Sequence, residues 1–491
     1  MLFARSTARI AGPLHPLFTL VAALAVVAGS LGISAVVGMN ETVALYLVAG
    51  LAVLIFSFVN TDFALSVLIL SMLLSPEINL GGGGNPDSAT ESERNVVVRI
   101  DDLVLALITL TWLVKTAVNK ELGIFVRTPL NRPMYVYLLI GLFSTIVGMF
   151  MGNVRPMIGI LYNVKYFQYF MIYLMAASHI RDMKTWRRYL SLIIFTGVAV
   201  SIYAIAQIPS GERVTAPFEG VEGEANTLGG YLVIIISLLL GILTGTRTVS
   251  RLAGLLGLLA LMLIPFAFTL SRSSWIAMGP ALLIVILYSP KRSAVMAGLV
   301  AGAVLLAIFL PSTVYERIEY TFSRENELRT DVVTIGGAAL DPSTSERIKS
   351  WGLTLKQWTQ RPVLGWGITG AGFKDAQYFR VLAETGVLGL AAFFWLLASV
   401  NRMGLRSLRR ISARRHPVYH GIVVGYIAAF WGLLTHAIGA NTFIIVRVME
   451  PFWFLTALVM LLPGLLEQED GKAETAERMQ PGAIPQAGEA R

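Results

Sequence analysis

Apolar residues recur along this chain in long runs that are separated by short polar stretches. A run of about 20 residues is what an α-helix needs to cross the hydrocarbon core of a bilayer. The pattern therefore predicts an all-α fold, a polytopic transmembrane helical bundle of about fourteen spans. The expected limits of the spans are 17–37, 42–59, 63–75, 103–118, 134–151, 158–177, 189–208, 228–244, 252–270, 274–289, 294–310, 379–400, 418–438 and 448–465.

Basic residues gather in alternate loops, whereas the intervening short loops hold only scattered arginines. Cytoplasmic loops of membrane proteins carry an excess of Lys and Arg. We expect the protein to lie in a bacterial inner membrane. With an even number of spans, both termini are expected in the cytoplasm. The basic loops are those around Arg5 and Arg9, Lys115–Arg132, Arg181–Arg188, Arg247 and Arg251, Lys291 and Arg292, and Arg402–Arg415.

The irregular, polar sequence falls on the outward side, in segments 76–101, 209–227 and 311–378. Residues 344–359 have helical periodicity, and Pro362 with the glycines that follow it ends this helix. We therefore expect a transmembrane domain over 1–466 that includes a large periplasmic loop, 311–378, with short helices. Residues 467–491 are polar and rich in Gly, Ala, Pro and Glu, which predicts a disordered cytoplasmic tail.

Composition narrows the possible chemistry. Hydrophobic residues make up 55% of the 491 residues and charged residues only 14%, compared with about 25% charged in soluble domains. The chain has no cysteine, which excludes disulfides and thiolate sites, and its five histidines show no metal-binding spacing. We expect neither a metal nor a cofactor. The net charge of +9 fits basic loops that face anionic membrane lipids rather than nucleic acid.

Two outward arginines lie beside predicted spans. Arg213 precedes the span that Asn226 opens, and Arg272 lies in the tight turn LSRSSW. Arg213 could be a solvated loop residue, Asn226 a helix N-cap and Arg272 a residue that reaches lipid headgroups. Alternatively, both arginines could bind an anionic group, because a guanidinium grips phosphate oxygens with two hydrogen bonds.

Asp375 lies where the large loop re-enters the membrane. It could cap a helix or act as a general base at the membrane boundary. Arg380 and Glu384 are four residues apart and could simply pair on one helix, and a lone histidine such as His436 is more often a packed polar residue. Topology places Arg213, Arg272 and Asp375 at one membrane face. Two cations and a carboxylate there suit a diphosphate leaving group and an acceptor hydroxyl.

Four stretches, in order, resemble the O-antigen ligase and O-antigen polymerase superfamily of membrane glycosyltransferases. They are RVTAPFEGVEGEANTLGGYL, LSRSSWIAM, ERIKSWGLTLKQWTQRPVLGWGITG and DAQYFRVLAETGVLGL, and together they cover roughly 210–400. The resemblance implies transfer from an undecaprenyl-diphosphate-linked donor in the periplasm, without a nucleotide sugar or metal. It implies phosphate binding by Arg213 and Arg272, and we expect Asn226, Arg347, Tyr378 and Arg380 to contact substrate as well.

One departure from the family pattern concerns the catalytic position. Ligases of the family carry a histidine where this chain has Asp375, whereas polymerase-like members more often resemble the Asp-x-x-Tyr form found here. We therefore favour a polymerase of O-antigen or exopolysaccharide, with Asp375 as catalytic residue and a lipid-linked repeat unit as acceptor. A chain-length regulator and a flippase are its expected partners.

Two alternatives remain open. A ligase would transfer the glycan to lipid A core or to protein. A transporter or flippase should show interrupted spans in two corresponding halves, and the polar residues here gather at one face instead.

Overall fold

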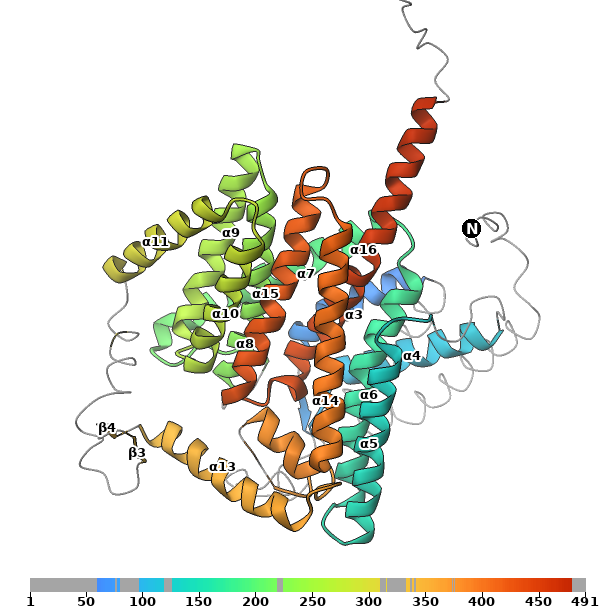
Figure 1. The fold of residues 1–491 in the computed structure, drawn as a ribbon, viewed down its shortest axis with the longest axis vertical. Helices are drawn as coiled ribbons and strands as arrows, with labels where there is room; N and C mark the ends of the chain where they lie inside the picture. The colour runs from blue at the N-terminus through green and yellow to red at the C-terminus, as the bar shows by residue number, and fades with distance from the viewer. Residues whose placement is uncertain are drawn as a thin grey trace, which may run out of the picture.

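The computed structural model describes residues 60–75, 77–79, 97–118, 126–218, 224–309, 315, 333–335, 338–339, 341–372, 374 and 376–478 (Figure 1). The regular secondary structure in these ranges is helical apart from two short β-ladders. The helices are α3 (Thr61–Leu74), α4 (Ile100–Val118), α5 (Asn131–Phe150), α6 (Pro156–His179), α7 (Met183–Gln207), η2 (Ile208–Ser210), α8 (Ala225–Gly245), α9 (Val249–Phe268), α10 (Arg272–Tyr288), α11 (Arg292–Phe309), α13 (Pro342–Gln360), α14 (Gln377–Arg410), α15 (Pro417–Gly439), η4 (Thr442–Ile444) and α16 (Val446–Arg478). The all-α prediction is confirmed for the described ranges.

Seven of the described helices are long and apolar enough to cross a membrane, namely α5, α7, α8, α9, α14, α15 and α16. The protein is therefore a multi-pass membrane protein. The predicted count of about fourteen spans is not reached within the described ranges, and two of the predicted spans, 17–37 and 42–59, lie outside them.

Helix length explains two of the predicted spans that are not among the seven. The prediction counted every apolar run, but α3 has 14 residues and α10 has 17. At about 1.5 Å per residue they measure about 21 and 26 Å, less than the ~30 Å hydrocarbon core. The 24-residue α6 is long enough but is not among the seven, and it carries the polar residues Asn163, Lys165 and Gln168.

The centre of the molecule is α8, which packs against α15 and α10 and is buried over most of its length. Each of α8 and α15 has two glycines four residues apart, Gly241 and Gly245 facing Gly421 and Gly425. A Cβ atom on Gly241 would overlap the carbonyl oxygen of Gly421. Small residues at this spacing let membrane helices approach closely, so the C-terminal end of α8 and the N-terminal end of α15, both next to the basic loops, are held together.

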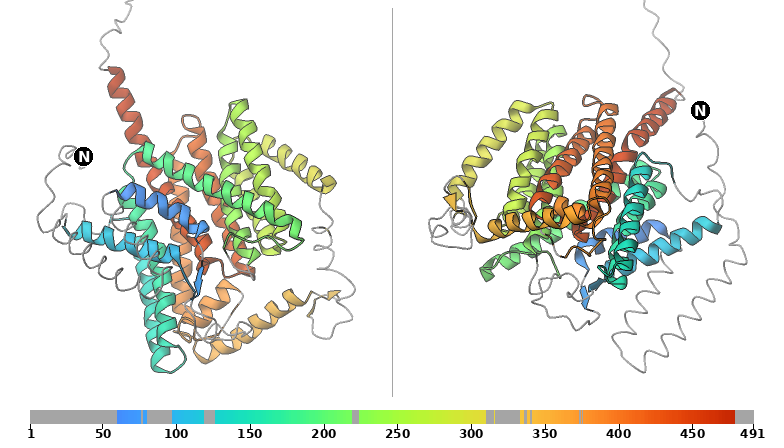
Figure 2. Two further views of the ribbon diagram at one scale, coloured as in Figure 1. Left: turned by 180° about the vertical axis from the view of Figure 1, so that it is seen from behind. Right: turned by 60° about the horizontal axis from the view of Figure 1, so that its bottom comes forward.

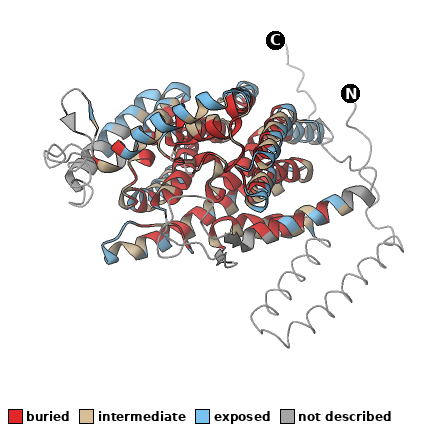
Figure 3. Ribbon diagram, turned by 90° about the horizontal axis from the view of Figure 1, so that it is seen from below, coloured by how far each residue is buried: buried red, intermediate tan, exposed pale blue. Residues whose placement is uncertain are grey.

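Buried residues concentrate between the helices and exposed ones lie around the periphery (Figure 3). Many of the exposed side chains on the long helices are large and apolar, for example Leu139 on α5, Phe195 on α7 and Ile276 on α10. An apolar surface this extensive would be unfavourable in water. It is the surface expected of a bundle surrounded by lipid.

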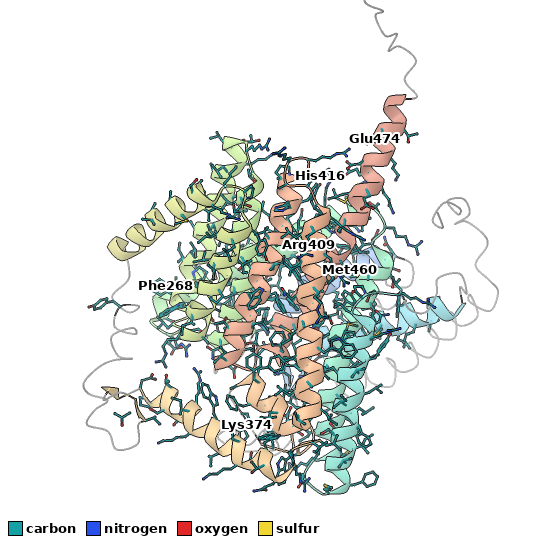
Figure 4. The ribbon with its side chains drawn as sticks, in the orientation of Figure 1. Phe268, Lys374, Arg409, His416, Met460 and Glu474 are labelled. Atoms are coloured by element: carbon teal, nitrogen blue, oxygen red, sulfur yellow. The ribbon has the colours of Figure 1, made fainter. Side chains whose placement is uncertain are left out.

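One end of the bundle carries the basic loops predicted to be cytoplasmic, and we call it the inner end (Figure 4, His416 and Glu474). Here α16 continues to Arg478, so residues 467–478 of the predicted disordered tail are helical, whereas 479–491 lie outside the described residues. Acidic residues of this extension meet basic residues of neighbouring helices. Glu469 pairs with Arg187, and Asp470 pairs with Arg415 and His416.

The opposite, outer end carries the α5–α6 turn and α13, which both lie at the bottom of Figure 1 and of the left view of Figure 2. The helix predicted at 344–359 is confirmed, with α13 beginning two residues earlier. Asp341 caps its N-terminus by accepting a hydrogen bond from the Thr344 amide, and Pro342 occupies the first turn. Both residue types are typical of these positions.

Two antiparallel ladders also occur. One joins β1 (Glu77–Asn79) to β2 (Val97–Arg99) with Ile78 opposite Val98, and the other joins β3 (Thr334–Ile335) to β4 (Ala338–Ala339). The first ladder pairs the two ends of the outer segment 76–101.

Candidate functional site

The turn between α9 and α10, residues 269–272, is the point at which the predicted arginines meet. Thr269 caps the C-terminus of α9, and Leu270 adopts a positive φ of 50°, which lets the chain reverse direction. Ser271 then caps α10 by accepting a hydrogen bond from the Ser274 amide. Arg272 is therefore the first residue of α10, and its position is fixed by the turn.

Two of the predicted residues hold this turn from the side of α8. The Arg213 Nε donates to the Thr269 carbonyl at 3.0 Å, and its Nη2 donates to the Leu270 carbonyl at 3.4 Å. The Ser271 hydroxyl donates to the Asn226 side-chain oxygen at 2.7 Å. Asn226 lies in the first turn of α8 and its side chain bonds the α9–α10 turn, whereas the expected N-cap position is occupied by Glu224. The structure thus brings Arg213, Asn226 and Arg272 together.

A buried network of polar side chains lies behind the turn. Ser274 contacts Ser271 at 2.8 Å and the His436 Nε2 at 3.1 Å, and the His436 Nδ1 contacts the Thr442 hydroxyl at 2.7 Å. Gly229 permits this packing because a Cβ at that position would overlap the Ser274 hydroxyl. His436 is fully buried, so the expectation that it is a packed polar residue fits its environment.

Arg272 forms a bidentate ion pair with Asp341, the residue that caps α13. Its Nη1 and Nη2 donate to the two carboxylate oxygens at 2.5 and 2.8 Å. Burial raises the pKa of Asp341, but hydrogen bonds from Arg272 and Thr344 more than offset this and lower the pKa to about 2. A carboxylate with a depressed pKa keeps its stabilising contribution above its ordinary pKa of about 4. The contribution is lost only as the pH falls through 2, so the bridge persists across the physiological range.

Arg347 reaches the same region from α13. A Cβ on Gly439, at the end of α15, would lie 3.6 Å from the Arg347 Nη1 and 3.2 Å from the Ser273 Cβ. The guanidinium of Arg347 therefore lies between α13, α15 and the start of α10. Together, Arg213, Arg272 and Arg347 surround one turn, which we call the arginine turn. An ion pair at this turn joins Arg272 to the Asp341 carboxylate.

The described residues next to Asp375 lie close to this region, although Asp375 itself lies outside the described residues. Both neighbours, Lys374 and Ala376, are buried. The Asn441 amide donates to the Lys374 carbonyl, and Asn441 is two residues from Gly439, against which Arg347 packs. Burial lowers the pKa of Lys374, an effect that the charge of Glu384 opposes.

Arg380 and Glu384 form the predicted ion pair on one helix, but the pair is buried rather than at an exposed interface. The Arg380 Nε lies 3.1 Å from the Glu384 Oε1, and both side chains are 2% exposed. Arg380 also lies over the Tyr162 ring at 5.6 Å, and Glu384 accepts from the Thr369 amide at 3.0 Å. These contacts favour a structural role for the pair. The predicted contact of Arg380 with substrate stays a prediction.

Glu384 lies just before a point at which the helical hydrogen bonds of α14 are interrupted, and turns 361–372 supply replacement hydrogen bonds there. Gly386 has φ 63° and ψ −166°, so the helical hydrogen bonds are interrupted there. Backbone bonds from the turns replace them. The Trp366 and Gly367 amides donate to the carbonyls of residues 383 and 384, and the Val387 amide donates to the Pro362 carbonyl. Gly365 and Gly386, which have no side chain, thus permit close contact between the backbone of the turns and that of α14.

Tyr378 is half-buried and faces the protein. Its hydroxyl donates to the Leu434 carbonyl at 2.7 Å, and its ring stacks on Phe394 at 5.8 Å. Its predicted contact with substrate stays a prediction.

Sequence reasoning missed two residues that build this region. Asp341 could have been recognised from the Asp-Pro pair, which is typical of a helix start. Arg447 looked like one more scattered outer arginine, but it is buried, and its guanidinium donates to the carbonyls of Leu73, Ser75, Pro217 and Phe218. It thereby joins the end of α3 to the segment that carries Arg213. No local sequence signal distinguishes such a residue from an exposed one.

The arrangement is suited to binding an anion at the outer end. Within the described ranges, no group of three or more histidine and acidic side chains could hold a metal ion. A cluster of guanidiniums with two-point hydrogen bonding is suited to phosphate oxygens.

Part of the chain matches the model of a known protein family. Residues 257–394 match the model of a family described as O-antigen ligase, and this confirms the resemblance for that part of the chain. The matched stretch begins within α9 and ends within α14, so it contains Arg272, Asp341 and Arg347 but neither Arg213 nor Asn226. A search of curated proteins found no match.

Proposed function

We propose that this protein is a polymerase of bacterial cell-surface polysaccharide that acts at the periplasmic face of the inner membrane. It transfers an undecaprenyl-diphosphate-linked glycan onto a hydroxyl of a lipid-linked repeat unit. The observation that carries the proposal is the convergence of Arg213, Arg272 and Arg347 on the α9–α10 turn, which lies within the O-antigen ligase match.

The reaction is a displacement at the anomeric carbon of the donor sugar. The acceptor hydroxyl oxygen forms the new bond to this carbon, and the bond to the diphosphate oxygen breaks. Undecaprenyl diphosphate leaves with the electron pair, and the hydroxyl proton passes to the Asp375 carboxylate. Arg213 and Arg272 stabilise the negative charge that develops on the diphosphate, which is the largest kind of contribution in many such reactions.

Donor binding requires a change of partner at Arg272. In this structure both terminal nitrogens of its guanidinium bond the Asp341 carboxylate. Phosphate oxygens offer the same two-point geometry as a carboxylate. Asp341 therefore holds the guanidinium in the orientation that a diphosphate needs, and the donor takes over one or both of these bonds.

A ligase is the second candidate, and the description of the matching family favours it. The sequence of the outer loop supports the polymerase instead, because residues 311–378 contain no histidine and Asp375 stands at the catalytic position of the family pattern. The two candidates differ only in the acceptor, so the same assay separates them.

The test is reconstitution of the purified protein with lipid-linked repeat units. We expect glycan polymer without added metal or nucleotide sugar. Arg272→Lys keeps the charge but loses the two-point bond, and Arg213→Ala removes the guanidinium. We expect each to reduce the rate by about 100-fold, the loss typical when one charge-stabilising donor is removed.

Arg406→Ala is the matched control, because Arg406 is exposed and lies in the predicted cytoplasmic loop region, and it should behave as the wild type. Transfer to lipid A core, with no joining of repeat units, would identify a ligase. Normal rates in both arginine variants would contradict the proposed site.

A further inference from the structure

A cavity of about 470 Å³ opens at the outer end, between the α5–α6 turn and the loop residues that precede α14. Asn153, Arg155 and Ile158 line it on the side of α6, and Thr369, Gly370 and Gly372 line it on the other side. Its volume falls within the range of about 300–1,000 Å³ found for small-ligand sites. It is separate from the arginine turn and has no role in the mechanism above.

The lining suits a carbohydrate. Asn153 offers an amide donor, Arg155 offers guanidinium donors, and Thr369 offers a hydroxyl. Glycine residues expose the backbone, and Ile158 provides an apolar surface. A sugar ring has hydroxyl groups around its edge and C–H groups on its faces, so it needs this mixture. The described residues that line the cavity include no carboxylate, which disfavours a catalytic role for the cavity itself.

The walls are held in place by contacts outside the cavity. Arg361 lies over the Trp366 ring at 4.2 Å. With the Asn153 amide oriented so that its oxygen faces Arg361, the guanidinium donates to it at 2.5 and 3.2 Å. Gly148 on α5 packs closely on Trp366, because a Cβ there would lie 2.6 Å from the Trp366 carbonyl oxygen. A binding site with fixed walls loses little entropy when a ligand binds.

The position of the cavity relative to the arginine turn indicates which part of the substrate it would take. Asp341 at the start of α13 bonds Arg272, and Arg361 just after its end lies beside Asn153. The 19 residues of α13 span about 28 Å at 1.5 Å per residue. The cavity and the arginine turn are thus at opposite ends of α13, and the chain leading to Lys374 and Ala376 runs between them.

We propose that this cavity binds sugars of the acceptor glycan. The proposal rests on the proposed function, since it divides one reaction between two binding places. The donor diphosphate lies at the arginine turn, and the acceptor repeat unit enters from the α5–α6 side. Gly372 is two residues from Lys374, a distance of at most about 7 Å along an extended chain. An acceptor held there is therefore near the segment that carries the proposed base.

A pair of adjacent substitutions tests the proposal. Ile158→Trp places a large ring in the cavity, whereas Met157→Trp is the matched control, because Met157 is 69% exposed and does not line the cavity. The probe is the lipid-free oligosaccharide released by mild acid from the host's own lipid-linked repeat unit, and its binding is measured by saturation-transfer NMR in detergent. We expect at least tenfold weaker binding in Ile158→Trp and wild-type binding in Met157→Trp.

Two further measurements keep the result decisive. Arg155→Ala replaces an exposed side chain that makes no capping hydrogen bond, so it should fold, and it too should weaken oligosaccharide binding severalfold. Undecaprenyl diphosphate should bind Ile158→Trp as it binds the wild type. Equal oligosaccharide binding in the wild type and in both cavity variants, or none in the wild type, would overturn the proposal. If the wild type bound the oligosaccharide and the cavity variants did not, but the wild type joined no repeat units, only the proposed function would be overturned.

Discussion

At the scale of single residues, burial and partners separate arginines that look alike in the sequence. Arg213 is exposed and bonds carbonyls at the arginine turn, whereas Arg447 is 1% exposed and bonds carbonyls of two outer segments. Arg380 is buried against Glu384 and the Tyr162 ring. A buried guanidinium needs hydrogen-bond partners to offset its loss of hydration, so Arg380 and Arg447 are suited to holding the structure and Arg213 to meeting a ligand.

The proposed base, Asp375, gives the sharpest prediction at this scale. Asp375→Asn keeps the size of the side chain and can still cap a helix, but it removes the charge. If the carboxylate accepts the acceptor proton, polymer formation from purified lipid-linked units should fall by at least about 100-fold, because general-base catalysis contributes about 10²–10⁴-fold.

Donor binding supplies the control for this variant. Undecaprenyl diphosphate should bind Asp375→Asn as tightly as the wild type, since its binding depends on the arginines. If Asp375→Asn remained fully active while Asp375→Ala lost activity, a capping role would replace the catalytic one.

At the scale of elements, turns 361–372 of the outer loop are bonded closely to α14 and α5. Turns 361–372 supply hydrogen bonds to the break at Gly386, and the Ser144 hydroxyl of α5 bonds the carbonyls of Leu364 and Glu384. The Pro- and Gly-containing stretch that resembles the family therefore forms a joint in the fold. This joint connects α5, turns 361–372 and α14. This joint fixes where the chain enters α14, and so where the residues next to Asp375 lie.

Gly386→Ala tests this joint. The φ and ψ angles of Gly386 lie in a region that only glycine adopts readily, at a cost of about 1–3 kcal/mol for other residues. A Cβ there would also overlap the Val363 carbonyl. We expect a clearly lower apparent melting temperature in detergent and loss of activity.

Gly352→Ala is the comparison, because Gly352 lies within α13 and a Cβ there meets nothing within 4 Å. Alanine is favoured over glycine by about 1 kcal/mol in a helix, so this variant should be at least as stable as the wild type. A normal melting temperature in Gly386→Ala would show that the joint is not needed.

At the scale of the whole molecule, the two ends differ in chemistry. The inner end holds the basic loops and the ion pairs that Arg187 and Arg415 form with α16. The outer end holds α13, the arginine turn and the cavity. The orientation, with the basic loops in the cytoplasm, stays a prediction from the distribution of Lys and Arg.

Cysteine labelling tests the orientation directly, since the chain has no native cysteine. Lys356 on α13 and Arg414 in the α14–α15 loop are both exposed. In intact inner-membrane preparations, a membrane-impermeant maleimide should label Lys356→Cys from the periplasmic side and Arg414→Cys only from the cytoplasmic side. The reverse pattern would place the arginine turn in the cytoplasm and remove the basis of the proposed reaction.

The sequence by itself determined the features that depend on local pattern. Apolar runs predicted the helices, since twelve of the fourteen predicted spans fall on described helices, and Pro362 with its glycines marked the irregular turns. Four motifs predicted the family that residues 257–394 match, whereas the orientation drawn from the distribution of Lys and Arg stays a prediction. These features could be recognised because hydrophobicity, backbone freedom and charge act over a few neighbouring residues.

Only the tertiary structure decided which distant groups meet. Arg272 and Asp341 are 69 residues apart and Arg447 and Pro217 are 230 apart, and no local pattern records either contact. The tertiary structure also showed that α16 continues past residue 466 and that a cavity forms beside Asn153. Such features depend on the shape left when helices pack together, which is a property of many residues at once.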